Sequence, residues 1–543
     1  MFHYIAKLKK PITLEILFYL IYTVAVATIP YLSKLLFDYD LGRGWTGILW
    51  ILLGYAGCCV VAAVAQNCSQ VEGWKRSAAF DLYVKSDVIR GLFRRPVTEF
   101  QRHSIGNYLS VLNNDIPALN TSYLEAIIDI INKAVQVVVY AVVLFVFVDF
   151  RIALVILLAS LLAVFVPRVT AGELSGRRKS YQSALGRYTA RVQDLLSGFR
   201  FVNRHTCGSM AAEHDRTAAE TEEAWLHFGR FKSFVIVFNN FVMDIVRLSA
   251  FAAIAVLLYR REITVGTAAA TLGYIESFTL PVQYILENIN EINSARGIRE
   301  KVLALIRYQP PEQKRLEPSD ACLVLDDVSV RYEKFRLQNI RYTFRPGKKY
   351  AVLGHNGSGK STLFQAVMRY VALSGGKVML DSQDLNGCDT ADVIMNTNQQ
   401  EHVFAASYRE NVSVFGAYPT DRLDEVEKYL ETDLLDTLRG KADCTELSGG
   451  QKQLLQLVRL LLAGRPVLLL DEPFSAVDET NRRLLERKLL GLPGRTILVI
   501  THDLTPEHLL RYDELLILQN GVLAAAGAPG DVLPTDAYRQ LLQ

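Results

Sequence analysis

The sequence predicts a multidomain protein: an all-α membrane domain of six helices with long cytoplasmic helix extensions, then an α/β phosphate-loop domain with an antiparallel β subdomain. Long apolar runs dominate the first part of the 543-residue chain, and the part after residue 320 has the composition of a soluble domain. A glycine-rich phosphate-binding loop lies in that second part, after a β-rich run. We therefore expect a membrane domain over residues 1–305, a linker over 306–319 and a nucleotide-binding domain over 320–543.

Six stretches are apolar enough to cross a bilayer, which takes about 20 residues for each helix. The first is too long for the core of a signal peptide and lacks a small-residue cleavage site, so we expect it to be retained. Short polar loops join the stretches in pairs. Long, charged, helix-compatible connections separate the second from the third and the fourth from the fifth, so the crossing helices are expected to continue well past the membrane. The six stretches are 12–36, 45–65, 127–148, 152–169, 234–259 and 265–285.

Basic residues are concentrated in the two long connections, whereas the short loops carry few. Because cytoplasmic segments carry an excess of lysine and arginine, the connections and both termini are expected in the cytoplasm. The phosphate loop must also face ATP, which predicts the same side. The net charge of +3 gives no reason to expect nucleic-acid binding. The basic residues are Lys75, Arg76, Lys85, Arg90, Arg94 and Arg95 in the first connection, and Arg177, Arg178, Lys179, Arg187, Arg191 and Arg200 in the second.

Charged residues inside a membrane span are costly and often functional. Asp244 in the fifth span and Glu276 in the sixth are candidates for lining a cavity that holds a transported molecule. Asp129 and Lys133 in the third span are one helical turn apart and are able to satisfy each other. Pairing between helices, or a position near the lipid headgroups, is the alternative interpretation for all four.

The phosphate-binding loop predicts a nucleoside triphosphate as ligand. A short strand, Tyr350–Leu353, precedes the loop, and a helix is expected from Gly359. The glycines let backbone N–H groups approach and face the phosphates. Lys360 is expected to reach the β- and γ-phosphates, and the Ser361 hydroxyl to bind Mg²⁺. The loop comprises Gly354, His355, Asn356, Gly357, Ser358, Gly359, Lys360, Ser361 and Thr362.

Two carboxylates follow a second strand signal. The apolar run Val467–Leu470 is typical of a buried parallel strand. Asp471 at its end is expected to hold Mg²⁺, and Glu472 to polarise the attacking water. Hydrolysis of this kind depends on positioning and charge stabilisation more than on covalent chemistry.

The pentapeptide Leu447–Gln451, of sequence LSGGQ, precedes that strand and identifies the type of nucleotide machine. Ser448 is able to cap a following helix, whose positive end then faces phosphate. Gly449 and Gly450 permit close backbone approach. With the phosphate loop and Asp471, this pattern resembles the nucleotide-binding domain of the ATP-binding cassette (ABC) family. The resemblance implies that Ser448, Gly449, Gly450 and Gln451 contact ATP held by a second copy of the domain.

The resemblance also assigns roles to residues that carry no clear signal alone. Tyr332 is similar to the aromatic residue that stacks on adenine. Gln399 resembles the glutamine that contacts the metal and the attacking water. Asp478 belongs to a segment similar to the D-loop at the dimer interface. His502 resembles the switch histidine, so the implied catalytic set is Glu472, His502, Gln399 and Lys360, with metal ligands Ser361, Gln399 and Asp471.

The membrane half resembles the exporter-type (type IV) transmembrane domain of ABC half-transporters. The likeness depends on the order of several short motifs: Arg95–Phe100, Gly106–Ser110, Asn114-Asp115, Leu280-Pro281-Val282 and Ser294–Arg296. It implies an ATPase that uses ATP and Mg²⁺ to move a small molecule across a lipid bilayer. A drug, lipid or peptide-like molecule is the expected cargo, and export the expected direction. The partner is expected to be a second half-transporter, as a homodimer or a heterodimer, in a bacterial inner membrane.

Two departures from the family pattern stand out. The segment Leu438–Glu446 is short and lacks the Thr-x-Val-Gly-Glu-type sequence that usually precedes the pentapeptide, which puts the usual contact with the membrane domain in doubt. Phe474 replaces a small polar residue before the D-loop serine. Neither departure touches the catalytic set.

Other functions remain open from the sequence. An importer of a metal-siderophore or another small molecule would use the same architecture. A membrane ATP-binding switch without transport is a second alternative, which Glu472 and His502 disfavour because a switch does not need them. A soluble ABC ATPase of DNA repair or translation is a third, and the six apolar stretches argue against it.

Overall fold

A computed structural model describes residues 1–40, 42, 44–148, 151, 154, 166–310, 314–316, 322–332, 335–397 and 402–543. The chain divides into two units, Met1–Phe93 with Ser104–Tyr308, and Arg94–His103 with Gln309–Gln543. The sequence puts the boundary at residue 305 and assigns residues 94–103 to the membrane domain. In the structure the boundary lies three residues later, and the segment with the short helix α4 (Val97–Phe100) groups with the second unit.

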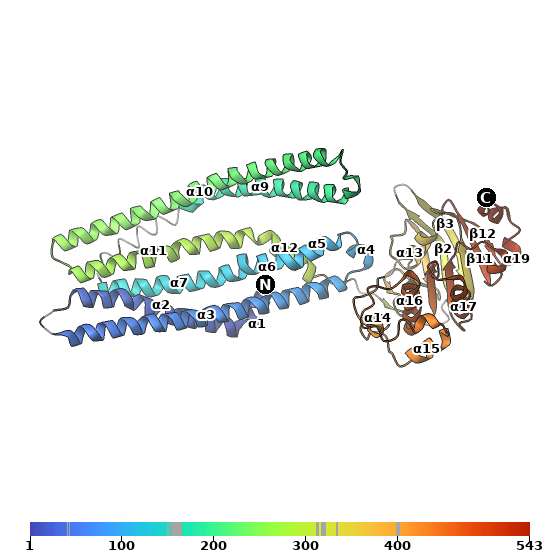
Figure 1. Ribbon diagram of the computed structural model, residues 1–543, viewed down its shortest axis with the longest axis horizontal. Helices are drawn as coiled ribbons and strands as arrows, with labels where there is room; N and C mark the ends of the chain where they lie inside the picture. The colour runs from blue at the N-terminus through green and yellow to red at the C-terminus, as the bar shows by residue number, and fades with distance from the viewer. Residues whose placement is uncertain are drawn as a thin grey trace. The chain divides into compact units, whose positions relative to one another are not determined.

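The first unit consists of long helices (Figure 1). Four of them pack side by side: α2 (Lys9–Phe37), α3 (Trp45–Phe93), α7 (Ala126–Val143) and α11 (Val265–Ser294). α7 continues a helical segment that begins at Ile105 and includes π-helical turns. The long helix extensions expected from the charged connections are therefore present. The remaining helices are α1 (Phe2–Lys7), α5 (Ile105–Ser110), α6 (Ile116–Leu119), α9 (Val166–Ser197), α10 (Cys207–Tyr259) and α12 (Arg296–Ile306).

Four of the described helices are long and apolar enough to cross a membrane: Lys9–Phe37, Trp45–Phe93, Ile105–Val146 and Cys207–Tyr259. They contain the first, second, third and fifth expected spans. Most of the expected span 152–169 lies outside the described residues. The expected span 265–285 falls within α11, which is helical over this range but is not among the four.

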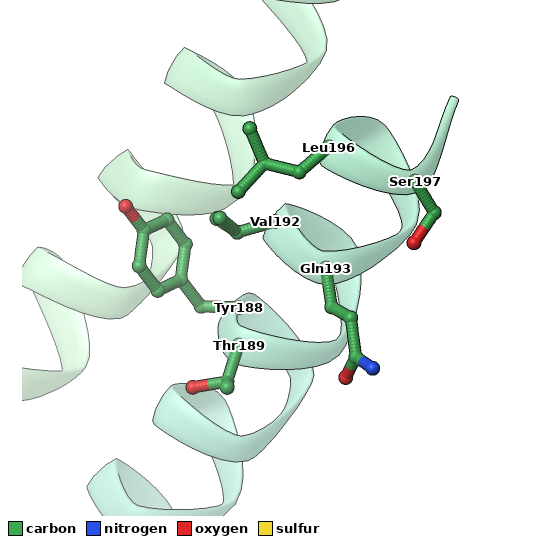
Figure 2. A pocket seen from close by; sticks show the side chains of 6 residues that line it. All are labelled: Tyr188, Thr189, Val192, Gln193, Leu196 and Ser197. Atoms are coloured by element: carbon green, nitrogen blue, oxygen red, sulfur yellow. The ribbon is translucent and has the colours of Figure 1, made fainter. Parts of the chain in front are cut away.

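α9 and α10 pack against each other as a separate arm of the first unit (Figure 1). Aromatic rings join them, with the Tyr181 and Trp225 centroids 4.7 Å apart. The Tyr188 hydroxyl lies 3.1 Å from Nε2 of His214. Figure 2 shows an open groove along α9. None of the residues that line it belongs to the phosphate loop or to the other predicted ATP-binding motifs. The groove is lined by Tyr188, Thr189, Val192, Gln193, Leu196 and Ser197.

The second unit contains a six-stranded sheet in the order β12-β11-β4-β10-β9-β8. All neighbours pair in parallel except β11 with β12. The central strands are buried along their length, as the fully apolar runs predict for a parallel sheet covered on both faces. The strands are β4 (Lys349–Leu353), β8 (Ile394–Thr397), β9 (Val467–Asp471), β10 (Thr496–Ile500), β11 (Glu514–Gln519) and β12 (Val522–Gly527).

An antiparallel sheet of four strands, in the order β3-β2-β5-β6, forms the expected β subdomain. The sequence predicts two strands, 322–325 and 328–332, where the structure has the single strand β2 (Leu323–Arg331). The prediction was wrong because the ladder continues through a bulge, where Asp327 adopts a positive φ of 58°. The other strands are β3 (Arg336–Phe344), β5 (Gly375–Leu380) and β6 (Gln383–Asp384), with β1 (Lys314–Arg315) and β7 (Cys388–Asp389) forming a separate pair.

The helices of the second unit include α13 (Lys360–Val367), α14 (Tyr408–Ser413), α15 (Leu423–Leu430), α16 (Gly449–Ala463) and α17 (Glu479–Leu490). α16 buries most of its side chains, because its apolar residues recur around several faces. Phe474, the unusual residue before the D-loop serine, is buried in the same apolar core. The short C-terminal helices are α18 (Pro506–Leu509), α19 (Pro529–Val532) and α20 (Asp536–Leu541).

Candidate nucleotide-binding site

The site lies at the carboxyl edge of the six-stranded sheet. β10 pairs in parallel with both β4 and β9, and Ile500 at its end is opposite Val352 and Asp471. The carboxyl ends of the three strands are therefore neighbours. The segments that follow them are the phosphate loop, the pair Asp471-Glu472 and the turn with His502. Strand order alone thus brings together motifs that are over a hundred residues apart, at the edge where ligands bind in such sheets.

The phosphate loop turns sharply between β4 and α13. Gly354 has φ of +152°, and a Cβ atom there would lie 2.5 Å from the Leu518 carbonyl oxygen, so this position needs glycine. The Lys360 ammonium is buried and donates to the carbonyl oxygens of Gly354 (2.7 Å) and His355 (3.1 Å). Burial lowers the pKa of Lys360, and the nearby charges of Asp471 and Glu472 oppose that shift. The Lys360 ammonium is therefore already held against the loop that would bind a triphosphate.

Ser361 and Asp471, two of the predicted metal ligands, are in contact. The Ser361 hydroxyl donates to Oδ2 of Asp471 at 2.9 Å. Burial raises the pKa of Asp471, and this hydrogen bond partly offsets the shift. Adjacent hydroxyl and carboxylate oxygens suit Mg²⁺, which also keeps water and phosphate oxygens as ligands. No group of three His, Cys, Asp or Glu that is able to hold a metal occurs among the described residues.

Glu472 and His502 form the second contact of the site, with Nε2 of His502 2.6 Å from Oε1 of Glu472. The side chain of Glu472 is mostly buried, and that of His502 is about half exposed. Glu472 has a positive φ of 47°, a strained conformation for a residue with a side chain. Its N–H donates to the Ile500 carbonyl oxygen at 3.1 Å, which ties the backbone of this turn to β10.

The pentapeptide begins α16 with the predicted cap. The Ser448 hydroxyl accepts from the Gln451 N–H, and the Gln451 side chain accepts from the Ser448 N–H at 3.0 Å, a reciprocal capping box. The capped end is exposed at Ser448 and Gly449. A Cβ atom at Gly449 would lie 2.9 Å from Cβ of Ala476. Within the described part of the chain, the side-chain hydrogen bonds of Ser448 and Gln451 go to each other and to Thr437, and none reaches the phosphate loop.

Gln453 connects α16 to the segment 475–478 that resembles the D-loop. Its amide donates to the Ser475 hydroxyl at 3.0 Å and accepts from the Ala476 N–H at 2.9 Å. Gln453 is buried and follows Gly449 by four residues, so both lie on the same face of α16. Gln453 is not among the residues predicted from sequence. The signal that could have identified it is a polar residue on the buried face of an amphipathic helix.

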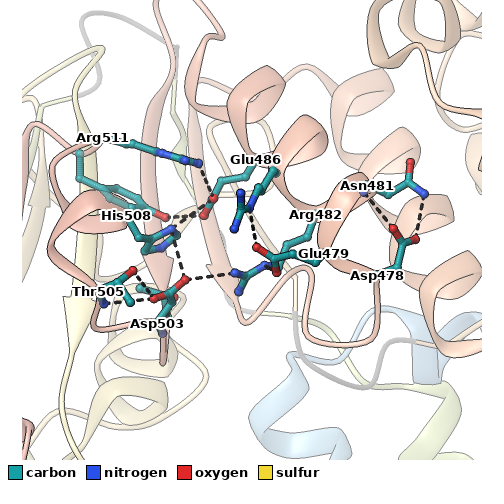
Figure 3. Close-up of polar contacts among 12 residues, drawn as sticks. Asp478, Glu479, Asn481, Arg482, Glu486, Asp503, Thr505, His508 and Arg511 are labelled. Carbon is teal, nitrogen blue, oxygen red and sulfur yellow. Dashed lines mark hydrogen bonds and ion pairs between the residues drawn. The ribbon is translucent and has the colours of Figure 1, made fainter.

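A polar network lies behind the D-loop segment (Figure 3). Asp478 caps α17 by accepting from the Asn481 N–H at 3.1 Å. One turn later, Arg482 donates to Oδ2 of Asp503 at 3.1 Å. The buried His508 places Nδ1 3.3 Å from Glu486 and 3.7 Å from Asp503. Arg482 and Asp503 are also absent from the residues predicted from sequence, because their pairing depends on how α17 packs beside the turn after β10.

The electrostatics of this network are set by hydrogen bonds more than by burial. Burial alone would raise the pKa of Asp503, but hydrogen bonds from Thr505 and the charges of His508 and Arg482 lower it below the ordinary value. Hydrogen bonds from Asn481 lower the pKa of Asp478. Both carboxylates are therefore firmly ionised at neutral pH.

The remaining predicted residues are not all joined to this site. The Tyr332 hydroxyl contacts Oε1 of Gln365 at 3.3 Å, and its side chain is 42% exposed at the end of β2, so the ring is accessible. Gln399 lies outside the described residues. Asp244 forms an ion pair with Arg247 on its own helix at 3.0 Å. The side chain of Glu276, on α11, is outside the described part of the structure.

Comparison with known proteins covers nearly the whole chain. Residues 337–475 match the family described as "ABC transporter", and residues 12–282 match "ABC transporter transmembrane region". A protein named ATP-dependent lipid A-core flippase from Haemophilus influenzae is 25% identical over 492 residues, 84% of this chain and 81% of the relative. A protein of the same name from Vibrio parahaemolyticus is 24% identical over 498 residues, 85% and 82% of the two chains.

A solved structure gives the same fold. The structure titled "Structure of a bacterial Atm1-family ABC exporter with ATP bound" superposes with a TM-score of 0.84. It covers 99% of this chain and 98% of the other, at 18% sequence identity. At that identity the likeness establishes the architecture of both units, not the molecule that is moved.

Proposed function

Because this chain belongs to the ABC transporters, as an exporter-type half-transporter whose ATP hydrolysis is coupled to transport, we propose that it exports a lipid-like molecule. The observation that carries the proposal is that one chain contains both a membrane-spanning unit and an ATP-hydrolysis site. A membrane-spanning unit precedes a site where Lys360, Ser361, Asp471, Glu472 and His502 converge on one sheet edge. The site supports hydrolysis and the membrane unit supports its coupling to transport.

In the proposed reaction, the phosphate loop binds the triphosphate and Lys360 neutralises its β- and γ-phosphates. Ser361 and Asp471 would hold Mg²⁺, which would supply positive charge to stabilise the phosphates. Glu472 orients and polarises the attacking water, and His502, which contacts Glu472 at 2.6 Å, stabilises the γ-phosphate end of the site. The strained turn at Glu472 holds its carboxylate in place before the nucleotide binds.

The active form is proposed to be a dimer of half-transporters. The exposed, capped start of α16 contacts the D-loop segment of its own chain through Gly449 and Gln453. This leaves the positive end of the helix available to ATP on a second copy. Asp478, at the exposed start of α17, is proposed to belong to the same interface. A homodimer and a heterodimer with a second half-transporter both fit this arrangement.

The protein is an integral membrane protein, and we propose the bacterial inner membrane as its location, with both termini and the ATPase unit in the cytoplasm. The excess of lysine and arginine in the two long connections supports this orientation. The proposed direction, export, is supported by relatives named as flippases of lipid A-core over more than four fifths of the chain. Import of a small molecule is the alternative that the experiment must exclude.

Reconstitution into proteoliposomes tests the proposal. Fluorescent phospholipid analogues placed in the leaflet that faces the ATPase unit should move to the other leaflet when Mg²⁺ and ATP are added. Glu472→Gln should abolish this movement and lower ATP hydrolysis at least about a hundredfold, because water activation is lost. The matched variant Glu507→Gln, an exposed carboxylate in α18, should behave as wild type.

Four results would each contradict or narrow one part of the proposal. Movement of the analogue in the opposite direction would favour import. An unchanged hydrolysis rate in Glu472→Gln would remove Glu472 from the reaction. Hydrolysis that no lipid stimulates and that moves no lipid would exclude a lipid-like cargo. A chain that hydrolyses ATP only after a second half-transporter is added would exclude the homodimer.

A further inference from the structure

Lys133 lies in the membrane-spanning unit between three helices, α2, α7 and α11. Its ammonium donates to the Tyr19 hydroxyl at 2.8 Å and to Oε1 of Gln136 at 3.4 Å. It also lies 5.3 Å from the centre of the Tyr19 ring and 5.4 Å from that of Tyr284. Two aromatic faces and two neutral oxygens therefore hold this cation.

The hydrogen bonds that Lys133 donates go to neutral oxygens. Within the described residues, no ion pair joins its ammonium to a carboxylate, although Asp129, one turn away on the same helix, still attracts it through space. Glu15, one turn before Tyr19 on α2, is instead held by Arg76 through two hydrogen bonds of 2.7 and 3.3 Å. Charged side chains in membrane spans are nearly always paired, so a cation held by neutral groups is unusual.

Access to Lys133 is open on one side. The Tyr284 side chain is 49% exposed, and Lys133 itself is only partly buried. Lysine carries three N–H donors, and the two hydrogen bonds leave one for a ligand. Lys133 is the seventh residue of the expected span 127–148, and the part of that span after it, residues 134–148, is apolar except for Gln136. A lysine near the end of a span extends its ammonium toward the lipid headgroups.

We infer that Lys133, flanked by Tyr19 and Tyr284, binds the anionic headgroup of the transported molecule. The inference rests on the proposed export of a lipid-like molecule and narrows its substrate class to amphipathic anions. The tyrosine rings and the neutral amide of Gln136 fix the ammonium without neutralising it. A lipid phosphate would place a negative charge in direct contact with the ammonium, and the lipid's acyl chains would lie against the apolar helices.

The test is direct binding to the purified full-length protein in detergent, measured by native mass spectrometry. The probes are phosphatidylglycerol, zwitterionic phosphatidylcholine and inorganic phosphate. Wild type should bind phosphatidylglycerol more tightly than phosphatidylcholine. Lys133→Met should weaken phosphatidylglycerol binding at least about tenfold and leave phosphatidylcholine unchanged, because one charge-assisted hydrogen bond is lost. Lys133→Arg, which keeps the charge, should stay within about threefold of wild type.

Further variants separate the parts of the site. Tyr284→Phe keeps the ring and should bind like wild type, whereas Tyr284→Leu should weaken only phosphatidylglycerol. Lys75→Met is the control for loss of a lysine, since Lys75 is 63% exposed and paired with Glu72 at 2.6 Å. Each variant is used only if its thermal unfolding matches that of wild type, and Tyr284→Leu serves as the loss-of-binding variant if Lys133→Met does not fold.

The outcomes separate this inference from the proposed function. Equal phosphatidylglycerol binding by wild type and Lys133→Met would overturn the inference, as would a wild type that does not distinguish the two lipids. Displacement of phosphatidylglycerol by inorganic phosphate at equal concentration would assign the site to a free anion rather than a lipid. Lipid transport that does not depend on headgroup charge would support export and contradict the anion site at Lys133. Charge-dependent binding without lipid transport would support the anion site and contradict export of a lipid-like molecule.

Discussion

Arg482 donates to the Asp503 carboxylate at 3.1 Å, and this ion pair joins the helix that begins at Asp478 to the residue that follows His502. The first of these segments is proposed to face the partner's nucleotide, and the second the chain's own. A rigid contact between the two segments would couple the nucleotide site of this chain to that of its partner. The side chains of Arg482 and Asp503 are 31% and 18% exposed, so solvent weakens their attraction only partly.

Replacing Arg482 by alanine should lower kcat for ATP several-fold and change KM little, because the residue lies behind the site. The same change in Asp503 should have a similar effect, and the double variant should be no worse than either single one. A coupling energy of about 1–2 kcal/mol is expected from thermal unfolding of the four proteins. Arg482→Lys should restore most of the rate.

Arg483→Ala is the matched control for this pair. Arg483 is the next residue on the same helix, is 65% exposed and pairs only locally, with Glu479 at 2.5 Å. It should hydrolyse ATP at the wild-type rate. Additive effects of the Arg482 and Asp503 changes would show that the two residues act independently.

His502→Ala should lower the hydrolysis rate by about ten- to a thousandfold, in the range found when one stabilising donor is removed from a reacting centre. ATP affinity should change by no more than a few-fold, because Lys360 and the loop backbone still bind the phosphates. Filter binding of ATP in the absence of hydrolysis checks affinity, and phosphate release checks the rate. A large loss of affinity would make His502 a binding residue instead.

Gln453→Leu should destabilise the ATPase unit by about 1–2 kcal/mol and lower hydrolysis, since both hydrogen bonds to Ser475 and Ala476 are lost from a buried position. Thermal unfolding of the full-length protein and steady-state ATP hydrolysis measure the two effects. Lys452→Ala, the adjacent position on α16, should change neither. Full activity in Gln453→Leu would mean that α16 and the D-loop segment are held together by other contacts.

Glu514 gives a prediction for pH dependence. Burial alone would raise its pKa, but hydrogen bonds from Tyr342 and from Lys348 at 2.9 Å lower it below the ordinary value of 4.5. A carboxyl with a lowered folded-state pKa contributes stability that is complete above the ordinary value and is lost as pH falls through the lowered one. Glu514→Gln should therefore be about 1–2 kcal/mol less stable than wild type at pH 7.

That difference should shrink as pH falls below 4.5, the window set by the lowered pKa of Glu514. Thermal unfolding of both proteins in detergent between pH 7 and pH 3 gives the comparison. Glu425→Gln, an exposed carboxylate whose side chain is 74% accessible, should show no such trend. A difference that stays constant with pH would mean that Glu514 contributes through packing and not through its charge.

Local features of the site followed from the sequence because each depends on nearby residues. Ser448 caps α16 since a serine three residues before a glutamine is able to form a capping box, and the run 467–470 forms a buried strand since it is apolar throughout. Features that depend on distant packing did not follow. Asp129 and Lys133, one turn apart, are able to satisfy each other, but Lys133 donates to the hydroxyl of Tyr19, 114 positions earlier.

The same limit explains the error in β2 and the missed residues. Asp326-Asp327 reads as a break between strands, yet pairing with β3 and β5 on both sides carries the strand through it. Arg482 and Asp503 look like ordinary surface charges until α17 is placed beside the turn after β10. Tertiary contacts decide such cases, and no window of sequence contains both partners.

The length of α3 has a mechanical consequence. It runs without proline for 49 residues, from Trp45 to Phe93, which at about 1.5 Å per residue makes a rod of about 74 Å. A tilt of about 5° around one end would move the other by about 6 Å, with no bend or unwinding along the way. Such a rod acts as a lever, because a small rotation at one end produces a large displacement at the other. Spin labels near the two ends of α3 should therefore report very different displacements for the same rotation.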